Sequence, residues 1–287
     1  MSVTPFDSAL FGPLLSDAET AALLDDRAQI RAMLDFEAAL ARAEARCGVI
    51  PAEAAERITT AAAGLEVNLE ALAAGTARDG IPVPALVAEL RAAVGGAAAA
   101  SVHWGATTQD VMDTGLILRL RAVLDILDRR LADLCDRLAV LAEAERGTVM
   151  LARTRGQQAT PTSFGLKAAG WLAPLDRHRE RLEELRPRVE VLSFGGASGN
   201  LAALGAQAKL APPVMPWHSQ RDALVELACW LGLVCGSLGK LAADVLLLCQ
   251  NEVGELREGT GGGSSTMPQK ANPVRSEAIL SLCRHCL

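Results

Sequence analysis

The sequence predicts an all-α protein built from long helices that pack side by side. Half of its 287 residues are hydrophobic, aromatic residues make up 3%, and tyrosine is absent. Alanine and leucine therefore fill the core, which favours helices over sheets. Over three long segments the apolar positions recur at alternating spacings of four and three, a pattern typical of packed helices. We expect a small N-terminal helical domain followed by a long central helical bundle.

The N-terminal domain is expected to span residues 1–100. Its longest helix is predicted from Asp26 to Arg46, and the shorter helical patterns around it are separated by glycine and proline. The glycines at 95 and 96 and the alanine run that follows them mark the junction with the central domain, residues 101–287.

Three seams of apolar residues define the central bundle, at 120–141, 164–185 and 224–248. The first long helix is predicted from about Asp110 to Arg146, which is roughly 55 Å at the usual rise per residue. Pro174 is expected to kink the second helix without ending it, because the seam continues past the proline. His178 falls on that seam, where a structural role is the more common one.

Composition and charge exclude several classes of function. The net charge is −6, with acidic and basic residues mixed along the helices, so we expect no nucleic-acid partner. No segment has eighteen uncharged apolar residues, and the first residues do not resemble a signal peptide, so we expect no membrane span. The seven scattered cysteines fit reduced thiols in a cytoplasmic protein.

One cysteine pair, Cys283-Arg284-His285-Cys286, has the spacing of a metal or redox motif. A second pair is absent, so a zinc site would lack ligands. We expect no metal and no redox role at this pair.

The most informative stretch is the loop from Gly263 to Pro273, which follows a glycine-rich segment and precedes a predicted helix. It gathers hydroxyls, a cation and amides in one loop, which is suited to closing over an anionic substrate and excluding water. The alternative is a glycine-serine linker, but linkers rarely carry Met-Pro-x-Lys-x-Asn-Pro between long helices.

Two further polar clusters precede long helices. Residues 101–110 combine hydroxyls, an amide and a free helix N-terminus, which would bind a carboxylate well; the alternative is an ordinary helix cap by Thr107 or Thr108. Residues 152–165 carry two arginines and two glutamines; the alternative there is a solvated turn with basic residues.

These three clusters resemble three signature segments of the fumarase/aspartase superfamily. They occur along this chain in the same order as in members of that superfamily. The loop matches G-S-S-x-M-P-x-K-x-N-P, and the other two resemble H-x-G-x-T-[ST]-x-D and R-T-x-G-Q-x-x-x-P-T-x-F-G. A weaker resemblance is the glycine-rich turn at residues 194–200. The resemblance implies proton transfer next to a carboxylate, with Ser265 as the carbon base and with Lys270 and Asn272 steadying the carboxylate and the enediolate formed from it.

The same resemblance implies a set of substrate-binding residues and an assembly. The binding residues are His103, Thr107, Thr108, Gln109, Thr154, Arg155, Gln157, Ser264 and Met267. Ser264 is the close competitor of Ser265 as proton carrier. Four chains would join into a twenty-helix core, and each active site would take segments from three chains. No cofactor and no metal are implied. Members continue into a C-terminal helical domain, so we expect that domain to be missing from this sequence.

One departure from the superfamily pattern indicates a subfamily. Adenylosuccinate lyases carry a histidine where this chain has Arg155. Bacterial 3-carboxy-cis,cis-muconate cycloisomerases also lack that histidine, and they share the sequence pattern of residues 103–114. A carboxylate leaving group needs no general acid, because its conjugate acid has a pKa near ~4, whereas an amine does. The resemblance therefore implies a cycloisomerase acting on a small tricarboxylate. The alternatives are an amine-eliminating lyase and a non-catalytic helical scaffold.

Overall fold

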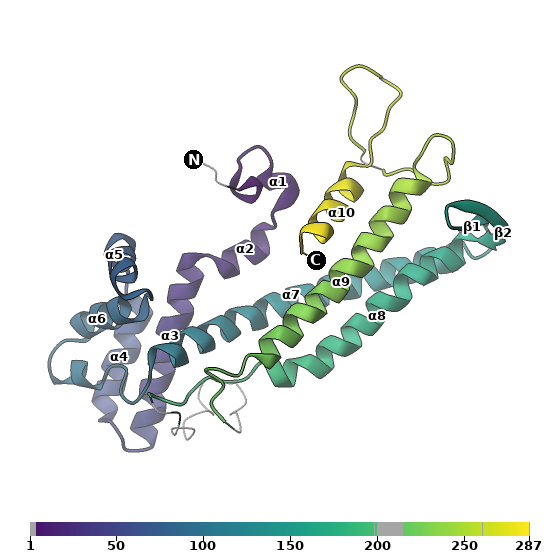
Figure 1. The fold of residues 1–287 in the computed structure, drawn as a ribbon. Helices are drawn as coiled ribbons and strands as arrows, with labels where there is room; N and C mark the ends of the chain where they lie inside the picture. Colours follow the sequence, from purple (N-terminus) through teal and green to yellow (C-terminus); the bar gives the residue numbers. More distant parts are fainter. Residues whose placement is uncertain (1–3, 198, 200–214, 260, 287) are drawn as a thin grey trace. The chain divides into compact units, whose positions relative to one another are not determined.

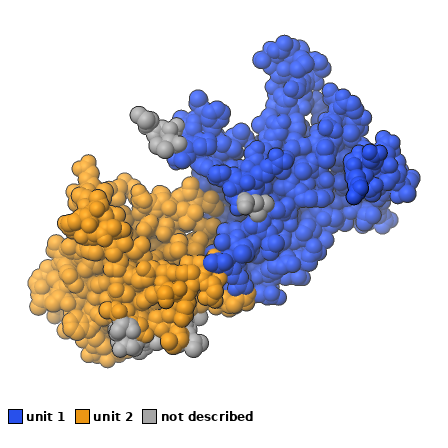
Figure 2. Space-filling view, viewed as in Figure 1, with its two compact units in different colours: residues 1–18, 126–185, 225–287 blue, residues 19–125, 186–224 orange. Residues whose placement is uncertain are grey.

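The computed structural model describes residues 4–197, 199, 215–259 and 261–286. The chain is helical apart from one two-stranded sheet (Figure 1), which confirms the predicted fold class. Internal contacts divide it into two compact units, shown in Figure 2. Unit 1 comprises residues 1–18, 126–185 and 225–287, and unit 2 comprises residues 19–125 and 186–224. A domain boundary at residue 100 stays a prediction.

Unit 2 contains the N-terminal helices, and the helix predicted from Asp26 to Arg46 forms with those bounds. Asp25 caps it by accepting a hydrogen bond from the Ala28 amide at 2.7 Å. The helices of this part are α2 (Ala18–Leu24), α3 (Asp26–Arg46), α4 (Ala52–Gly64), α5 (Leu69–Asp79), α6 (Val83–Val94) and the short 3-10 helix η2 (Ala97–Ser101). The core between α3 and α4 buries Leu34 and Ile58 almost completely.

The long helices are α7 (Thr108–Ala144), α8 (Phe164–Val189) and α9 (Asp222–Leu248). The bounds of α7 lie two residues before the predicted ones at each end. Pro174 lies inside α8, which continues past it as the seam predicted. The remaining helices are η1 (Pro5–Asp7), α1 (Gly12–Leu15) and α10 (Val274–Cys286).

His178 is a structural residue of unit 1. Its side chain is buried, and its Nε2 lies 2.8 Å from the Ser237 hydroxyl. Its carbonyl accepts a hydrogen bond from the Trp230 indole at 2.8 Å. Burial, followed by the neighbouring Arg181 and Arg177, lowers the pKa of this imidazole, so it stays neutral inside the α8–α9 interface.

A β-hairpin joins α7 to α8 and was not anticipated from the sequence. Strands β1 (Val149–Thr154) and β2 (Gln157–Ser163) pair antiparallel, with Thr154 opposite Gln157. Only Arg155 and Gly156 connect them, with φ values of 53° and 75°. Two positive φ values in a two-residue connection match the twist of a hairpin, so this local turn chemistry, rather than a long apolar pattern, forms the strands.

Helix α9 leaves much of its apolar surface uncovered within this chain. Over its most apolar eighteen residues the mean hydropathy is 1.8, and 17% of them are buried. Val225, Leu233 and Leu247 are each more than half exposed. By length and composition alone α9 could cross a membrane, a test that core helices of soluble proteins also pass.

Candidate active site

The first predicted cluster lies in unit 2, where the chain turns into α7. His103 has a positive φ of 60°, and its Nδ1 lies 2.6 Å from Oε1 of Glu37 on α3. The Glu37 side chain is almost fully buried, and its second oxygen has no hydrogen-bond partner among the described residues. Burial, and then repulsion from Glu37, raise the pKa of nearby Glu44 to about 7. His103 is thus held by the buried carboxylate of Glu37.

The turn into α7 is organised by Asp110, which is fully buried. Its carboxylate accepts hydrogen bonds from the amides of Thr107, Gly195 and Gly196, each at 2.9 Å. Its Oδ1 also lies 2.6 Å from Nε2 of His218. The bond back to Thr107 satisfies one free amide of the helix start, as in a capping box. Asp110 therefore fixes the backbone that carries the predicted binding residues.

The predicted residues at the start of α7 are placed by this arrangement. Thr107 precedes the helix, and Thr108 and Gln109 are its first two residues. The Gln109 amide donates to Oδ1 of Asp113 at 2.8 Å, and Arg221 donates to the same oxygen at 2.8 Å. No hydrogen bond of the described residues occupies the hydroxyl of Thr107 or Thr108, so both remain available to a ligand.

The second cluster lies in unit 1, on the β1–β2 hairpin. Arg153 forms two hydrogen bonds with the Glu255 carboxylate, at 2.7 and 3.0 Å, and thereby ties the hairpin to the segment after α9. Arg155 lies at the exposed tip, as do its neighbours Thr154 and Gln157. Within the part of the chain that the structure describes, the Arg155 guanidinium has no hydrogen-bond or ion-pair partner.

Backbone strain coincides with the predicted site. His103 and Arg155 are the non-glycine residues with positive φ in the described ranges. A left-handed conformation costs a residue with a β-carbon roughly 1–2 kcal/mol, and such residues concentrate at functional sites. Both were predicted from sequence as substrate-binding residues, and that assignment stays a prediction.

The third cluster is the loop between α9 and α10, which Figure 1 shows extending beyond the ends of both helices. Gly262 and Asn272 exchange two backbone hydrogen bonds at 2.8 Å and close the base of the loop. A β-carbon on Gly262 would lie 2.5 Å from Cγ2 of Val274, so a larger residue at this position would force the Val274 side chain to move. Glu258 accepts hydrogen bonds from the Ser276 amide and hydroxyl at 3.3 and 3.0 Å, which anchors the loop to α10.

The two serines of the loop are not equivalent. The Ser264 hydroxyl accepts hydrogen bonds from the amides of Thr266 and Met267, at 3.2 and 3.0 Å. The Ser265 hydroxyl is exposed and has only a 3.4 Å contact with the Thr266 hydroxyl. Ser264 therefore shapes the loop, and Ser265 presents its oxygen outward.

The other predicted residues of this loop are also placed. Lys270 is exposed, and no described residue binds its side chain. The Asn272 amide makes a long contact of 3.4 Å with the Gly263 carbonyl. Met267 is 44% exposed. Within unit 1, no hydrogen bond among the described residues joins this loop to Thr154, Arg155 or Gln157, so the two clusters are presented separately.

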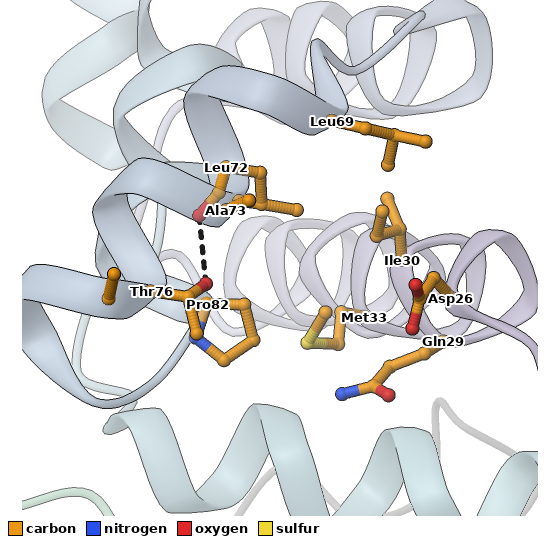
Figure 3. Close-up of a pocket in the computed structure, with 10 residues that line it drawn as sticks. Asp26, Gln29, Ile30, Met33, Leu69, Leu72, Ala73, Thr76 and Pro82 are labelled. Atoms are coloured by element: carbon orange, nitrogen blue, oxygen red, sulfur yellow. Dashed lines mark hydrogen bonds between the residues drawn. The ribbon is translucent and has the colours of Figure 1, made fainter. Parts of the chain in front are cut away.

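A cavity of about 500 Å³ in unit 2 contains none of the predicted site residues. Figure 3 shows it between α3 and α5, with Ile30, Met33 and Leu72 on its walls and Asp26 and Gln29 at one side. The Thr76 hydroxyl, which could serve a ligand there, is instead bonded to the Leu72 carbonyl at 2.8 Å. The residues that line this cavity are mostly apolar, and none of them belongs to the three clusters.

Sequence reasoning missed the residues that hold the first cluster, namely Glu37, Asp113, His218 and Arg221. Asp110 stood in the recognised segment without an assigned role. The partners of His103 and Asp110 lie 66 and 108 residues away in sequence, so no local pattern identifies them. Part of the glycine-rich turn at 194–200, residues 198 and 200, lies outside the described residues.

Comparison with known proteins places these features in a family. Residues 16–287 match the model of the lyase family. The chain is 49% identical to 3-carboxy-cis,cis-muconate cycloisomerase of Pseudomonas aeruginosa, with 95% of this chain and 63% of that protein covered. It thus spans less than two thirds of the length of that relative.

Two solved structures have the same fold. The 3-carboxy-cis,cis-muconate lactonizing enzyme from Pseudomonas putida matches with a TM-score of 0.88 and 43% identity, over 97% of this chain and 66% of that one. A fumarate lyase from Mesorhizobium sp. BNC1 matches with a TM-score of 0.86 and 42% identity, over 94% of this chain and 63% of that one.

Proposed function

Because the chain belongs to the lyase family, that is, to the fumarase/aspartase superfamily, we propose that it interconverts 3-carboxy-cis,cis-muconate and carboxymuconolactone. This is the reaction named for a relative at 49% identity. The observation that carries the proposal is Arg155. Where an amine-eliminating lyase of the superfamily would present a histidine, this chain presents a guanidinium at an exposed hairpin tip, and no described residue binds it.

The reaction is an intramolecular addition and needs one proton at carbon. An oxygen of one substrate carboxylate attacks the alkene, so a carbon–oxygen bond forms and the π electrons move toward the carbon beside another carboxylate. The resulting aci-carboxylate carries developing negative charge, which preorganised donors stabilise. The Ser265 hydroxyl then delivers its proton to that carbon and regains one from solvent. In the reverse direction Ser265 acts as the base.

The roles of the two loop serines follow from their contacts. Ser264 keeps two backbone amides bonded and holds the loop in shape, while Ser265 has an exposed hydroxyl. Lys270 carries a cation with no partner among the described residues, and Asn272 supplies an amide from the same loop. A cation and an amide donor close to a serine favour both the aci-carboxylate and the serine anion.

The remaining carboxylates of a tricarboxylate need their own donors. Arg155 can bind one through charge-assisted hydrogen bonds, and Gln157 lies directly after the same turn. The hydroxyls of Thr107 and Thr108, together with the free amides at the start of α7, suit another carboxylate. His103 and Gln109 flank these threonines and complete the proposed binding set with Thr154 and Met267.

We also propose that several copies of the chain associate, in a tetramer with dihedral symmetry, and that the protein is cytoplasmic. Helix α9 is strongly apolar and little buried among the described residues, and an exposed apolar face of this kind marks an interaction surface. The occupant we propose is a second copy of the same chain, because seams of this kind pair helices with each other. Such association would let clusters of different chains meet in one site.

The proposed reaction is tested by absorbance assays with three substrates in parallel: 3-carboxy-cis,cis-muconate, adenylosuccinate and argininosuccinate. Cyclisation removes the conjugated diene, so its absorbance should fall only with the muconate. Efficient cleavage of adenylosuccinate or argininosuccinate would overturn the proposal in favour of an amine-eliminating lyase. Absence of turnover with all three, in a folded and associated protein, would instead favour the non-catalytic scaffold.

A further inference from the structure

Glu37 is a buried carboxyl group in the middle of helix α3. Its side chain is 1% exposed, and its neighbours one turn away on the same helix, among them Met33, Leu34 and Ala41, are buried apolar residues of the core. An ionised carboxyl group in such surroundings destabilises the fold unless it is paired and hydrogen-bonded. Packing alone would favour an apolar residue at position 37, so the core of unit 2 does not account for this carboxylate.

The partner of Glu37 is His103, in the turn between η2 and α7. Oε1 of Glu37 lies 2.6 Å from Nδ1 of His103, a short contact of the kind that charge-assisted hydrogen bonds make. The second oxygen of Glu37 has no hydrogen-bond partner among the described residues. In the part of the chain that the structure describes, the bond to His103 is therefore the one hydrogen bond of this carboxylate.

The two nitrogens of the His103 ring differ in their surroundings. Nδ1 faces Glu37, and because a carboxylate only accepts hydrogen bonds, Nδ1 carries a proton in this contact. No described residue hydrogen-bonds Nε2, and Nε2 is not one of the buried polar atoms that lack a partner. The side chain is 15% exposed. Nε2 is thus the ring nitrogen that a ligand can reach.

We propose that Glu37 is a positioning residue, which fixes a proton on Nδ1 of His103 and holds the ring so that Nε2 meets a substrate carboxylate. The bond that one histidine nitrogen makes sets the state of the other. When Nε2 also donates, the ring carries a proton on both nitrogens, and Glu37 balances its positive charge from the buried side. Without Glu37 the ring can place a single proton on either nitrogen, and it then donates as a neutral group, which makes a weaker bond.

The role of His103 in this inference rests on the proposed function, whereas the position of the proton rests on the Glu37–His103 contact alone. A purely structural bond would tie the turn to α3 and do nothing more. Turnover would then not depend on the two residues as a unit. Two measurements on the full chain separate these cases, and the first needs no activity.

The first measurement is NMR of the chain labelled with ¹⁵N in its histidines, of which the sequence has four. At about pH 9, well above the ordinary histidine pKa of about 6.5, long-range proton–nitrogen correlations distinguish a protonated ring nitrogen from an unprotonated one. His103→Gln identifies the signals of His103. We expect a protonated Nδ1 in the wild type and its loss in Glu37→Leu.

The matched control for the NMR measurement is Glu44→Gln, because Glu44 is also buried on α3 and no hydrogen bond among the described residues joins it to His103. This variant should keep the proton on Nδ1. An unprotonated Nδ1 in the wild type, or an unchanged Nδ1 proton in Glu37→Leu, would overturn the proposal. The wild-type spectrum decides the point by itself even if Glu37→Leu does not fold.

The second measurement is the kinetics of 3-carboxy-cis,cis-muconate turnover in single and double variants. Glu37→Leu and His103→Gln should each lower kcat/KM by about tenfold or more, the loss expected when a charged donor no longer meets a carboxylate. The double variant should be no slower than His103→Gln, because Glu37 acts through the ring. Glu37→Gln keeps the size and one acceptor oxygen, so its kcat/KM should lie between those of the wild type and Glu37→Leu.

Losses that multiply in the double variant, or wild-type kinetics in Glu37→Leu, would show that Glu37 does not act through His103 and would overturn the proposal. A folded wild type that does not turn over the muconate would instead refute the proposed function. The NMR measurement would still decide where the proton of His103 lies, so the two failures are distinguishable.

Discussion

Replacing Asp110 by alanine tests whether this buried carboxylate organises the first cluster. The side chain is fully buried and accepts four hydrogen bonds, from three backbone amides at 2.9 Å and from His218 at 2.6 Å. Each buried donor left without a partner costs about 1–3 kcal/mol. Water entering the vacated space would recover part of this, so we expect a loss of about 3–5 kcal/mol in unfolding free energy, the usual cost of breaking a buried charged pair.

Urea unfolding followed by circular dichroism measures the global effect, and hydrogen exchange at Gly195 and Gly196 measures the local one. Both amides should exchange at least tenfold faster in Asp110→Ala. The matched control is Asp35→Ala, which removes an exposed carboxylate that pairs with Arg31 one turn away on α3. Such exposed pairs contribute about 0.3–0.5 kcal/mol. An Asp110→Ala protein within about 1 kcal/mol of the wild type, with unchanged exchange at both glycines, would refute this reasoning.

The remaining predictions concern charge and assembly. Arg155→Leu should lower kcat/KM by about tenfold to a hundredfold without unfolding the protein, because it removes a charge-assisted contact worth about 1.5–3 kcal/mol from an exposed position; unchanged kinetics would exclude Arg155 from the site. Mixing Arg155→Leu with Ser265→Ala chains and refolding them together should restore about a quarter of the wild-type sites if each site takes the two residues from different chains; sedimentation of a fully active monomer would contradict this. Burial raises the pKa of Glu44 to about 7 from an ordinary 4.5, so the folded state holds this proton more tightly than the unfolded state. The stabilisation that protonated Glu44 gives is therefore complete below pH 4.5 and declines by roughly 2–3 kcal/mol as pH rises to 7. In Glu44→Gln, the urea concentration at the unfolding midpoint should change less between pH 4.5 and pH 7 than in the wild type. An unchanged pH dependence of that midpoint would show that another group titrates.

Much of the fold could be read from local patterns. The helix from Asp26 to Arg46 has both predicted ends, and α8 continues through Pro174 because its apolar seam does. These features depend on spacing and capping along one stretch of chain. The hairpin at 149–163 was missed for the opposite reason, since its strands are short and depend on a two-residue turn with positive φ at Arg155 and Gly156.

In the candidate site, too, local sequence segments identify some residues and only the tertiary fold identifies the others. The side chains that face solvent, such as Ser265, Lys270 and Arg155, could be picked from the sequence because each lies in a recognisable segment. The residues that hold the site in place could not. Glu37 is joined to His103, and His218 to Asp110, only by the tertiary fold, and a buried polar pair leaves no periodic signal in either segment.

The measurement that tests the central claim most directly is cyclisation of 3-carboxy-cis,cis-muconate in D₂O, followed by NMR. We predict that the wild type forms the lactone with one deuterium on the carbon beside the carboxylate, because the Ser265 proton exchanges with solvent before it is delivered. Ser265→Ala should lower the rate by about a hundredfold or more, the usual share of a positioned acid or base, and Ser264→Ala should be milder. Lactone formation at the wild-type rate by Ser265→Ala would contradict the account, as would the absence of lactone with the wild type.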